Sequence, residues 1–174
     1  NACNYQSWHL YCITDKSKVS ALIPDICTQE WIKNASIAVV ITENNTRLAE
    51  RWGKEKADLF VAEDAGACAQ NMLLMAAELG YAGVFVGAFD EEKCKKYVGA
   101  GENECPVLIV PIGTYEIEPP LRDRKAFDEV VTFYEKVFEK KGSIYTINRW
   151  VEFDFGNKLS IYNKLYDGEK IKIK

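Results

Sequence analysis

Histidine is almost absent from this 174-residue sequence, in which His9 is the only one. The six cysteines include no Cys-x-x-Cys pair, so their spacing predicts neither a zinc site nor a dithiol redox centre. A single imidazole also argues against a His-rich metal site and against a hydrolase built on a Ser-His or Cys-His pair. We therefore expect six free thiols and no metal.

Long apolar runs and an excess of positive charge are also missing. No apolar stretch reaches the roughly 18 residues that cross a bilayer, and no secretory leader pattern opens the chain. Acidic residues outnumber basic ones by 26 to 22, which leaves no basic face for the phosphates of a nucleic acid. These absences predict a cytoplasmic protein with no membrane partner and no nucleic-acid partner.

What the sequence does contain is an alternation of apolar, strand-length segments with helical patterns. Apolar residues make up 48% of the chain, which is enough for one globular core. Strands are predicted at residues 8–14, 35–42, 83–86 and 107–112, and helical segments at 16–23, 47–52, 59–79 and 91–97. This order is typical of a layered α/β or α+β domain.

The segment 59–79 carries the clearest helical pattern. Its apolar residues recur at spacings of three and four, with Met72, Met75 and Leu79 among them, and Gly80 stands where a helix cap belongs. Such spacing predicts a broad apolar face on the helix. We expect both methionines to pack in the core.

The chain changes character after Gly113. Residues 119–125 form a charged link that begins with two prolines, and residues 127–138 carry one more amphipathic helical pattern. Residues 142–174 then alternate apolar and polar positions around two turn dipeptides, which predicts a β-rich extension in the form of a small meander. An arm that embraces a partner subunit is one hypothesis for this extension.

Three separated segments carry the motifs with functional meaning. The first is Asn-Ala-Cys-Asn-Tyr-Gln-Ser-Trp at residues 1–8. The second runs through the 64–80 helix to Val-Phe-Val-Gly-Ala-Phe-Asp at 84–90, and the third is Pro-Ile-Gly at 111–113 followed by Arg-Asp-Arg-Lys at 122–125. In this order they resemble the nitroreductase family of flavin enzymes, and the resemblance covers about residues 1–131.

The resemblance implies an α+β fold of three layers, with a central mixed or antiparallel sheet flanked by helices. It makes residues 1–141 an FMN-binding domain, followed by the β-rich extension at 142–174. Members of the family bind FMN where the two chains of a homodimer meet. The implied reaction passes hydride from NADH or NADPH through flavin N5 to a small acceptor such as a nitroaromatic or a quinone, without a catalytic protein acid or base.

A flavin also needs a close backbone approach at N5, which the segment after the predicted 83–86 strand can offer. Gly87 and Ala88 are small, and a backbone N–H between Val86 and Ala88, with Gly87 favoured, is predicted to point at N5. The alternative is a turn at the end of a strand that needs glycine for its dihedral angles.

The first segment supplies the side chains expected along the ring edge. The amides of Asn4 and Gln6 both donate and accept, as the pyrimidine edge of a flavin requires. Asn4 could instead be a turn residue whose side chain bonds locally. Ala2 and Cys3 belong to the same segment and to the predicted cofactor site, although an inert buried thiol is the simpler interpretation of Cys3.

Three charged residues complete the predicted site. Arg122 and Arg124 lie two apart on an extended link, where they project to one side and are predicted to clamp the FMN phosphate. The alternative is a solvated basic run. In the resemblance, Asp64 matches a polar helix position near the ribityl chain, and the alternative for this residue is an aspartate that caps a helix start.

The sequence departs from the family pattern at its start. The family's preceding helix with an Arg-x-Ser-x-Arg phosphate motif has no counterpart before Asn1, and Ser7 replaces the usual proline before Trp8. We expect either a fragment of a longer chain or the loss of that part of the phosphate site. A catalytically inactive flavin-binding or flavin-free scaffold of the same fold is therefore the alternative to an enzyme, and a thiol redox protein is a third hypothesis.

Overall fold

The computed structural model describes residues 1–117 and 123–132. Contacts divide the chain into a unit Asn1–Ile117 and a unit Glu118–Lys174. In the second unit, helix α5 (Phe127–Val130) ends where Val131 takes up an extended conformation, with φ −124 and ψ 125. The predicted β-rich extension at 142–174 lies outside the described residues, so the division into 1–141 and 142–174 stays a prediction.

A four-stranded sheet forms the centre of the first unit. Its strands are β1 (Trp8–Ile13), β2 (Ile37–Glu43), β3 (Ala82–Gly83) and β4 (Cys105–Gly113). Their order is β1-β2-β4-β3, and every neighbouring pair is antiparallel. The register places Trp8 opposite Glu43 and Ile37 opposite Ile112. Strands β1 and β3 are therefore the two edges of the described sheet.

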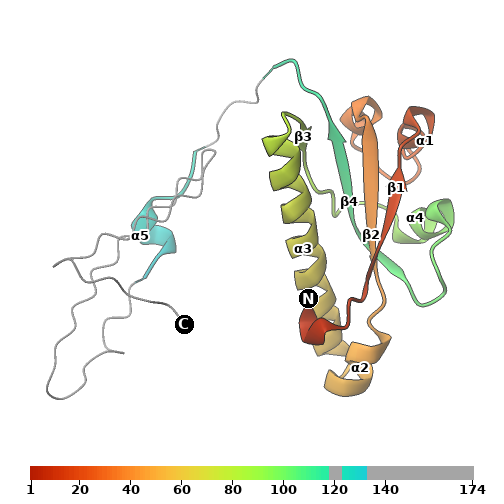
Figure 1. The fold of residues 1–174 in the computed structure, drawn as a ribbon, viewed down its shortest axis with the longest axis vertical. Helices are drawn as coiled ribbons and strands as arrows, with labels where there is room; N and C mark the ends of the chain where they lie inside the picture. The colour runs from red at the N-terminus through yellow and green to blue at the C-terminus, as the bar shows by residue number, and fades with distance from the viewer. Residues whose placement is uncertain (118–122, 133–174) are drawn as a thin grey trace, which may run out of the picture. The chain divides into compact units, whose positions relative to one another are not determined.

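Strand β2 shows why the sheet is covered on both faces. Its side chains alternate, so Val39 and Ile41 belong to one core cluster while Ala38 and Val40 belong to another. A continuous apolar run is the pattern expected of a strand buried on both sides. Helices lie on the two faces of the sheet in Figure 1. The predicted α+β fold of three layers is confirmed, with an antiparallel sheet in the part of the chain that the structure describes.

Among the described elements, helix α3 (Lys54–Glu78) alone forms one outer layer. The small side chains of Ala65 and Ala69 are fully buried and seat the helix on Val39 and Val110 of the sheet. The helix begins five residues earlier than predicted, directly after Gly53, and it ends as predicted before Gly80, whose φ is +78. Across the described segments, no helix combines the length and apolar character needed to cross a membrane.

The opposite layer consists of shorter helices. It contains α1 (Lys16–Ser20), the 3-10 turn η2 (Glu30–Asn34) and α4 (Glu91–Val98). Asp15 caps α1 by accepting a hydrogen bond from the Ser17 N–H at 2.8 Å, and Asp90 caps α4 in the same way. Buried Val19 and Cys94 join these helices to the sheet in one cluster.

A third cluster lies at the corner where α2 (Thr46–Trp52) meets the start of α3. Its buried members are Leu48, Ala57 and Val61, and Ala2 and Tyr5 pack against them. The cluster therefore fastens the N-terminal 3-10 turn η1 (Ala2–Asn4) to the helices. In Figure 1 this turn lies beside the first half of α3 and next to α2.

A groove of about 580 Å³ lies between α3 and strands β1 and β2, and it is lined by apolar side chains such as Leu10, Val39 and Met72. Met75 and Leu79 stand at this groove with 59% and 64% of their surface exposed. The prediction that Met75 packs in the core is therefore wrong for the single chain. Strand β1 is an edge of the described sheet, so the sheet does not extend beyond β1 on that side of the groove.

The only histidine belongs to a polar cluster on the other face of the sheet. His9 Nδ1 lies 3.0 Å from Glu104 Oε1, while the hydroxyls of Tyr11 and Thr42 donate to Glu104 Oε2 at 2.7 and 3.0 Å. Burial tends to raise the pKa of Glu104, but these hydrogen bonds outweigh it and hold the pKa below its usual range. The cluster therefore ties the loop before β4 to strands β1 and β2.

Candidate flavin site

The N-terminal segment has an unusual backbone. Cys3, Asn4 and Gln6 have φ values of 53, 54 and 53, which lie in the left-handed region. Residues other than glycine rarely adopt this region, and each such residue costs of the order of 1 kcal/mol or more. Strain of this kind persists only where surrounding contacts impose it, and it gathers at functional segments. The turn therefore merits attention as part of a site.

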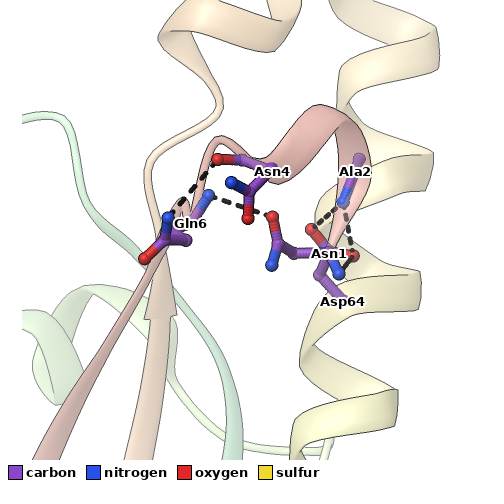
Figure 2. Close-up of polar contacts among 5 residues, drawn as sticks. All are labelled: Asn1, Ala2, Asn4, Gln6 and Asp64. Atoms are coloured by element: carbon purple, nitrogen blue, oxygen red, sulfur yellow. Dashed lines mark hydrogen bonds and ion pairs between the residues drawn. The ribbon is translucent and has the colours of Figure 1, made fainter.

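Asp64 supplies the contact that holds the turn (Figure 2). The Ala2 N–H donates to both carboxylate oxygens of Asp64, at 3.0 and 2.9 Å. The Gln6 N–H donates to Asn1 Oδ1 at 3.2 Å, which closes the turn on itself. Asp64 lies in the middle of α3 rather than at its start, so the alternative of a helix-capping aspartate is wrong. Its carboxylate positions the predicted ring-binding segment.

Anchored in this way, the turn presents its polar side chains to solvent. Asn4 and Gln6 are exposed, and the side-chain amide of Asn4 has no hydrogen-bond partner among residues 1–117 and 123–132. The alternative of a locally bonded Asn4 side chain is thus not observed. Cys3 is also exposed, so the interpretation as a buried inert thiol is wrong. The free side-chain amide of Asn4 can both donate and accept, as the donors and acceptors along the pyrimidine edge of a flavin would require.

A buried acid, Glu43, lies under the same region. Its side chain is 2% exposed, and neither carboxyl oxygen has a hydrogen-bond partner in the described structure. Burial raises the pKa of Glu43 to about 7, and the negative charge of Asp64 adds to the rise. The Ser7 hydroxyl opposes part of this increase without reaching hydrogen-bonding geometry. Burial followed by the charge of Glu43 also raises the pKa of Cys68 on α3.

Sequence reasoning missed Glu43, although a signal was present. Side chains of a strand alternate between its two faces, and Val39 and Ile41 face α3. The alternation therefore predicts that Glu43, two positions further on, faces α3 as well.

The second part of the candidate site follows β3. The Val86 N–H donates to the Ile109 carbonyl at 2.7 Å, so it belongs to the sheet and is not available to a ligand. Gly87 and Ala88 are exposed, and their N–H groups have no acceptor within the described ranges. The Ala88 carbonyl accepts from Gln29 Nε2 at 3.3 Å, which helps to fix the segment. Of the three predicted donors, two remain free.

Gly87 is not required by the chain's own backbone or packing. Its φ lies outside the left-handed region, and a Cβ added there would meet only Leu108 Cδ2 at 3.8 Å, an ordinary contact. The alternative of a turn that needs glycine for its dihedral angles therefore finds no support. A glycine that the fold does not need is consistent with the close approach of a ligand.

The two parts of the site do not meet within one chain. Asn4 precedes β1 and Gly87 follows β3, at opposite edges of the sheet. Three strand spacings separate those edges by about 14 Å. A ring bound where two chains meet, as the resemblance implies, could take one segment from each chain.

The predicted phosphate clamp is not assembled by the described residues. Arg124 is exposed and belongs to the second unit, whose position relative to the first is not defined, and Arg122 lies outside the described residues. Their role stays a prediction. Sequence reasoning also missed two arginines of α2, Arg47 and Arg51, which contact the ring of Tyr5 or its hydroxyl beside the turn.

The sheet and its two helical layers match those of solved nitroreductase structures, so the chain has the nitroreductase fold. The crystal structure of a nitroreductase family protein from Streptococcus pneumoniae is 15% identical, has a TM-score of 0.66, and is matched over 74% of this chain and 80% of that one. The NADPH:FMN oxidoreductase from Vibrio harveyi complexed with NAD⁺ is 23% identical with a TM-score of 0.63, over 78% of this chain and 61% of that one.

The family follows from the sequence match. The Nitroreductase family model matches residues 25–114, slightly more than half of the chain, and the chain belongs to this family. A curated relative from Methanocaldococcus jannaschii, which is named as a nitroreductase, is 33% identical over 85 residues. These residues make up 49% of this chain and 41% of that protein. The chain spans less than two thirds of the length of the curated relatives it matches.

Proposed function

We propose that this protein is an FMN-dependent oxidoreductase of the nitroreductase type. It takes hydride from NADH or NADPH and delivers it to a small acceptor such as a nitroaromatic or a quinone, as a cytoplasmic homodimer. The observation that carries the proposal is that the N–H groups of Gly87 and Ala88 have no acceptor within the described residues. The fold itself does not require glycine at position 87, and the space beside it is open.

The residues present fit the group that the family implies. When bound, FMN would supply a ring that accepts hydride at N5 and passes it on. The Gly87 N–H would donate toward N5, and the exposed amides of Asn4 and Gln6 would bind the pyrimidine edge. Asp64 would orient this edge by holding the Ala2 N–H.

The remaining predicted residues would support the same site. Val86 would fix the end of the β3 segment through its two hydrogen bonds to Ile109. Cys3 lies next to Asn4 in the exposed turn. Arg122 and Arg124 would bind the phosphate through charge-assisted hydrogen bonds. The protein contributes position and electrostatics in this scheme, and no side chain acts as acid or base.

Exposed apolar side chains support the homodimer. Leu74 and Met75 on α3, with Leu79 directly after the helix, are 59 to 64% exposed, and Phe85 beyond β3 is 44% exposed. A soluble monomer rarely leaves several large apolar side chains uncovered on one helix. Contact between two copies would bury them, and it would also allow the turn of one chain to approach the Gly87 segment of the other.

Reconstitution with FMN tests the proposal directly. We expect the purified chain to retain flavin colour after gel filtration and to lose this colour anaerobically when NADH or NADPH is added, because hydride reaches N5. A nitroaromatic or a quinone should then restore the colour. A protein that keeps flavin but does not respond to either dinucleotide would be the inactive scaffold, and a protein that ignores FMN would remove the proposed function altogether.

Two glycines give a matched test of the proposed N5 contact. Replacing Gly87 with Ala should leave the free energy of unfolding within about 0.5 kcal/mol of the wild type, because the new Cβ meets only an ordinary contact. FMN binding should weaken about tenfold or more, since a methyl group intrudes where the backbone must approach the ring. Urea unfolding and flavin titration measure the two effects.

The contrasting variant is Gly83→Ala. A Cβ there would lie 2.8 Å from Leu73 Cδ2 and 3.1 Å from the Pro111 carbonyl oxygen, so the free energy of unfolding should fall by about 1 to 3 kcal/mol. Unchanged FMN affinity in Gly87→Ala would show that the ring does not approach this backbone.

A further inference from the structure

A group of cations and aromatic rings surrounds the N-terminal turn on its α2 side. The guanidinium carbon of Arg47 lies 4.4 Å from the centre of the Tyr5 ring, and Arg51 Nη1 donates to the Tyr5 hydroxyl at 3.3 Å. Arg51 also lies over the Trp52 ring at 5.1 Å. Lys56 Nζ is 5.3 Å from the centre of a further ring, that of Phe60. We call Tyr5, Arg47, Arg51, Trp52 and Lys56 the basic aromatic patch.

The three cations of this patch carry no acidic partner. Arg47, Arg51 and Lys56 are exposed, and none forms an ion pair with a carboxylate in the described residues. Among the nearby acids, Asp58 accepts from Lys54 Nζ and from Asn45 Nδ2, both at 2.5 Å, and the exposed Glu50 and Glu55 form no ion pair within the described residues. Three positive charges are therefore free to meet an anion.

The aromatic members give the patch a defined shape. Trp52 is 48% exposed, and the edge-on contact with Phe60, at 6.3 Å and 86° between the rings, holds its indole in place. The stacked arginines are likewise held in position, so they lose little freedom when they bind a ligand. An exposed indole beside two fixed guanidinium groups matches a ligand that is both planar and anionic.

The position of the patch narrows the class of ligand. Tyr5 lies between Asn4 and Gln6, so the patch adjoins the segment assigned to the ring edge. A ligand seated on Arg47 and Arg51 could thus extend toward that ring. Reduced nicotinamide dinucleotides have this construction, with a reacting ring at one end and a diphosphate and a purine at the other.

We propose that the basic aromatic patch binds the adenosine diphosphate half of the reduced dinucleotide. Arg47 and Arg51 donate charge-assisted hydrogen bonds to the diphosphate, and the purine stacks on Trp52. The identity of the full ligand rests on the proposed function. Binding of the adenosine diphosphate half does not, because it requires neither flavin nor turnover.

Calorimetric titration with ADP-ribose, which lacks the nicotinamide ring, is the primary test. We expect the full chain to bind ADP-ribose and the double variant Arg47→Gln, Arg51→Gln to bind it about tenfold more weakly or worse. ADP-ribose should also quench part of the tryptophan fluorescence, and Trp52→Phe should remove this quenching. The matched control is Lys16→Gln, Lys96→Gln. It also removes two positive charges, one from α1 and one from α4, and should leave ADP-ribose binding unchanged.

A second measurement uses the flavin-loaded protein. In the double arginine variant, the KM for NADH or NADPH should rise about tenfold, whereas reduction by nicotinamide mononucleotide in its reduced form should be unchanged because that donor lacks the adenosine phosphate. Equal losses with both donors would overturn the inference, since the arginines would then act on the turn. A loss of FMN affinity with ADP-ribose binding intact would overturn it as well.

The two proposals can fail separately. Arginine-dependent ADP-ribose binding in a protein that never reacts with a dinucleotide would sustain the patch and reject the enzyme. Flavin reduction by NADH together with no ADP-ribose binding, or with binding that the double variant retains, would sustain the enzyme and reject the patch.

Discussion

Replacing Glu43 with Gln should raise the free energy of unfolding at pH 8 by about 3.5 kcal/mol and should abolish most of its dependence on pH between 5 and 7. The pKa of this carboxyl is about 7 in the folded protein, against an ordinary value of 4.5. Between these values the unfolded chain releases a proton that the folded chain retains, so stability falls as pH rises. At about 1.4 kcal/mol per unit of pKa, the loss is complete above pH 7 and approaches about 3.5 kcal/mol.

The groups around Glu43 account for the direction. Desolvation between β2 and α3 is the largest cause, and the carboxylate of Asp64 adds to it. Glutamine has the shape of the neutral acid but does not ionise, so the variant should behave at pH 8 as the wild type does at pH 5. Urea unfolding at several pH values measures the difference, and Glu50→Gln, an exposed acid on α2, is the control. Parallel stability curves for Glu43→Gln and the wild type would contradict the assignment.

Removing the Asp64 carboxylate should weaken FMN binding about tenfold or more. In Asp64→Ala the Ala2 N–H loses its acceptor, and the turn with three left-handed residues loses the contact that imposes its shape. Asp64→Asn keeps one carbonyl oxygen and should restore much of the affinity. Flavin titration measures binding, and the chemical shift of the Ala2 amide proton reports whether the hydrogen bond is present.

The neighbouring acid Glu63 provides the control for this pair. It is exposed on the same helix, and Glu63→Ala should leave both the amide shift and FMN affinity as they are. If Asp64→Ala alters the amide shift but not FMN affinity, the turn does not bind the ring. If it alters neither, the anchor itself is misassigned.

The sheet was largely predictable because its central strands carry strong patterns. The continuous apolar run in β2 predicts a strand covered on both faces, and the structure places it between β1 and β4. The beginning of α3 was not predictable from apolar spacing. Its first turns are charged, and Gly53 precedes the helix where a Ser or Asp cap would have marked the start.

The candidate site shows the same limit at the level of single atoms. The resemblance pointed to the stretch of chain after β3, but which of its N–H groups is free depends on Ile109, a residue of another strand. The role of Asp64 depends on a hydrogen bond that spans 62 residues. The arginines of α2 could not be predicted as part of a site because their partners, Tyr5 and Trp52, are aromatic rings. The sequence alone does not show which rings lie beside which cations.

The placement of the turn and the Gly87 segment at opposite edges of the sheet has a genetic consequence. If each ring is bound by the turn of one chain and the Gly87 segment of the other, a dimer contains two composite sites. A chain with one defective segment then still carries an intact copy of its second segment. Mixed dimers of an Asn4-defective chain and a Gly87-defective chain would then hold one wholly intact site and one doubly damaged site. Two alleles that each give an inactive homodimer would therefore complement one another, and the mixed dimer would have about half of the wild-type activity.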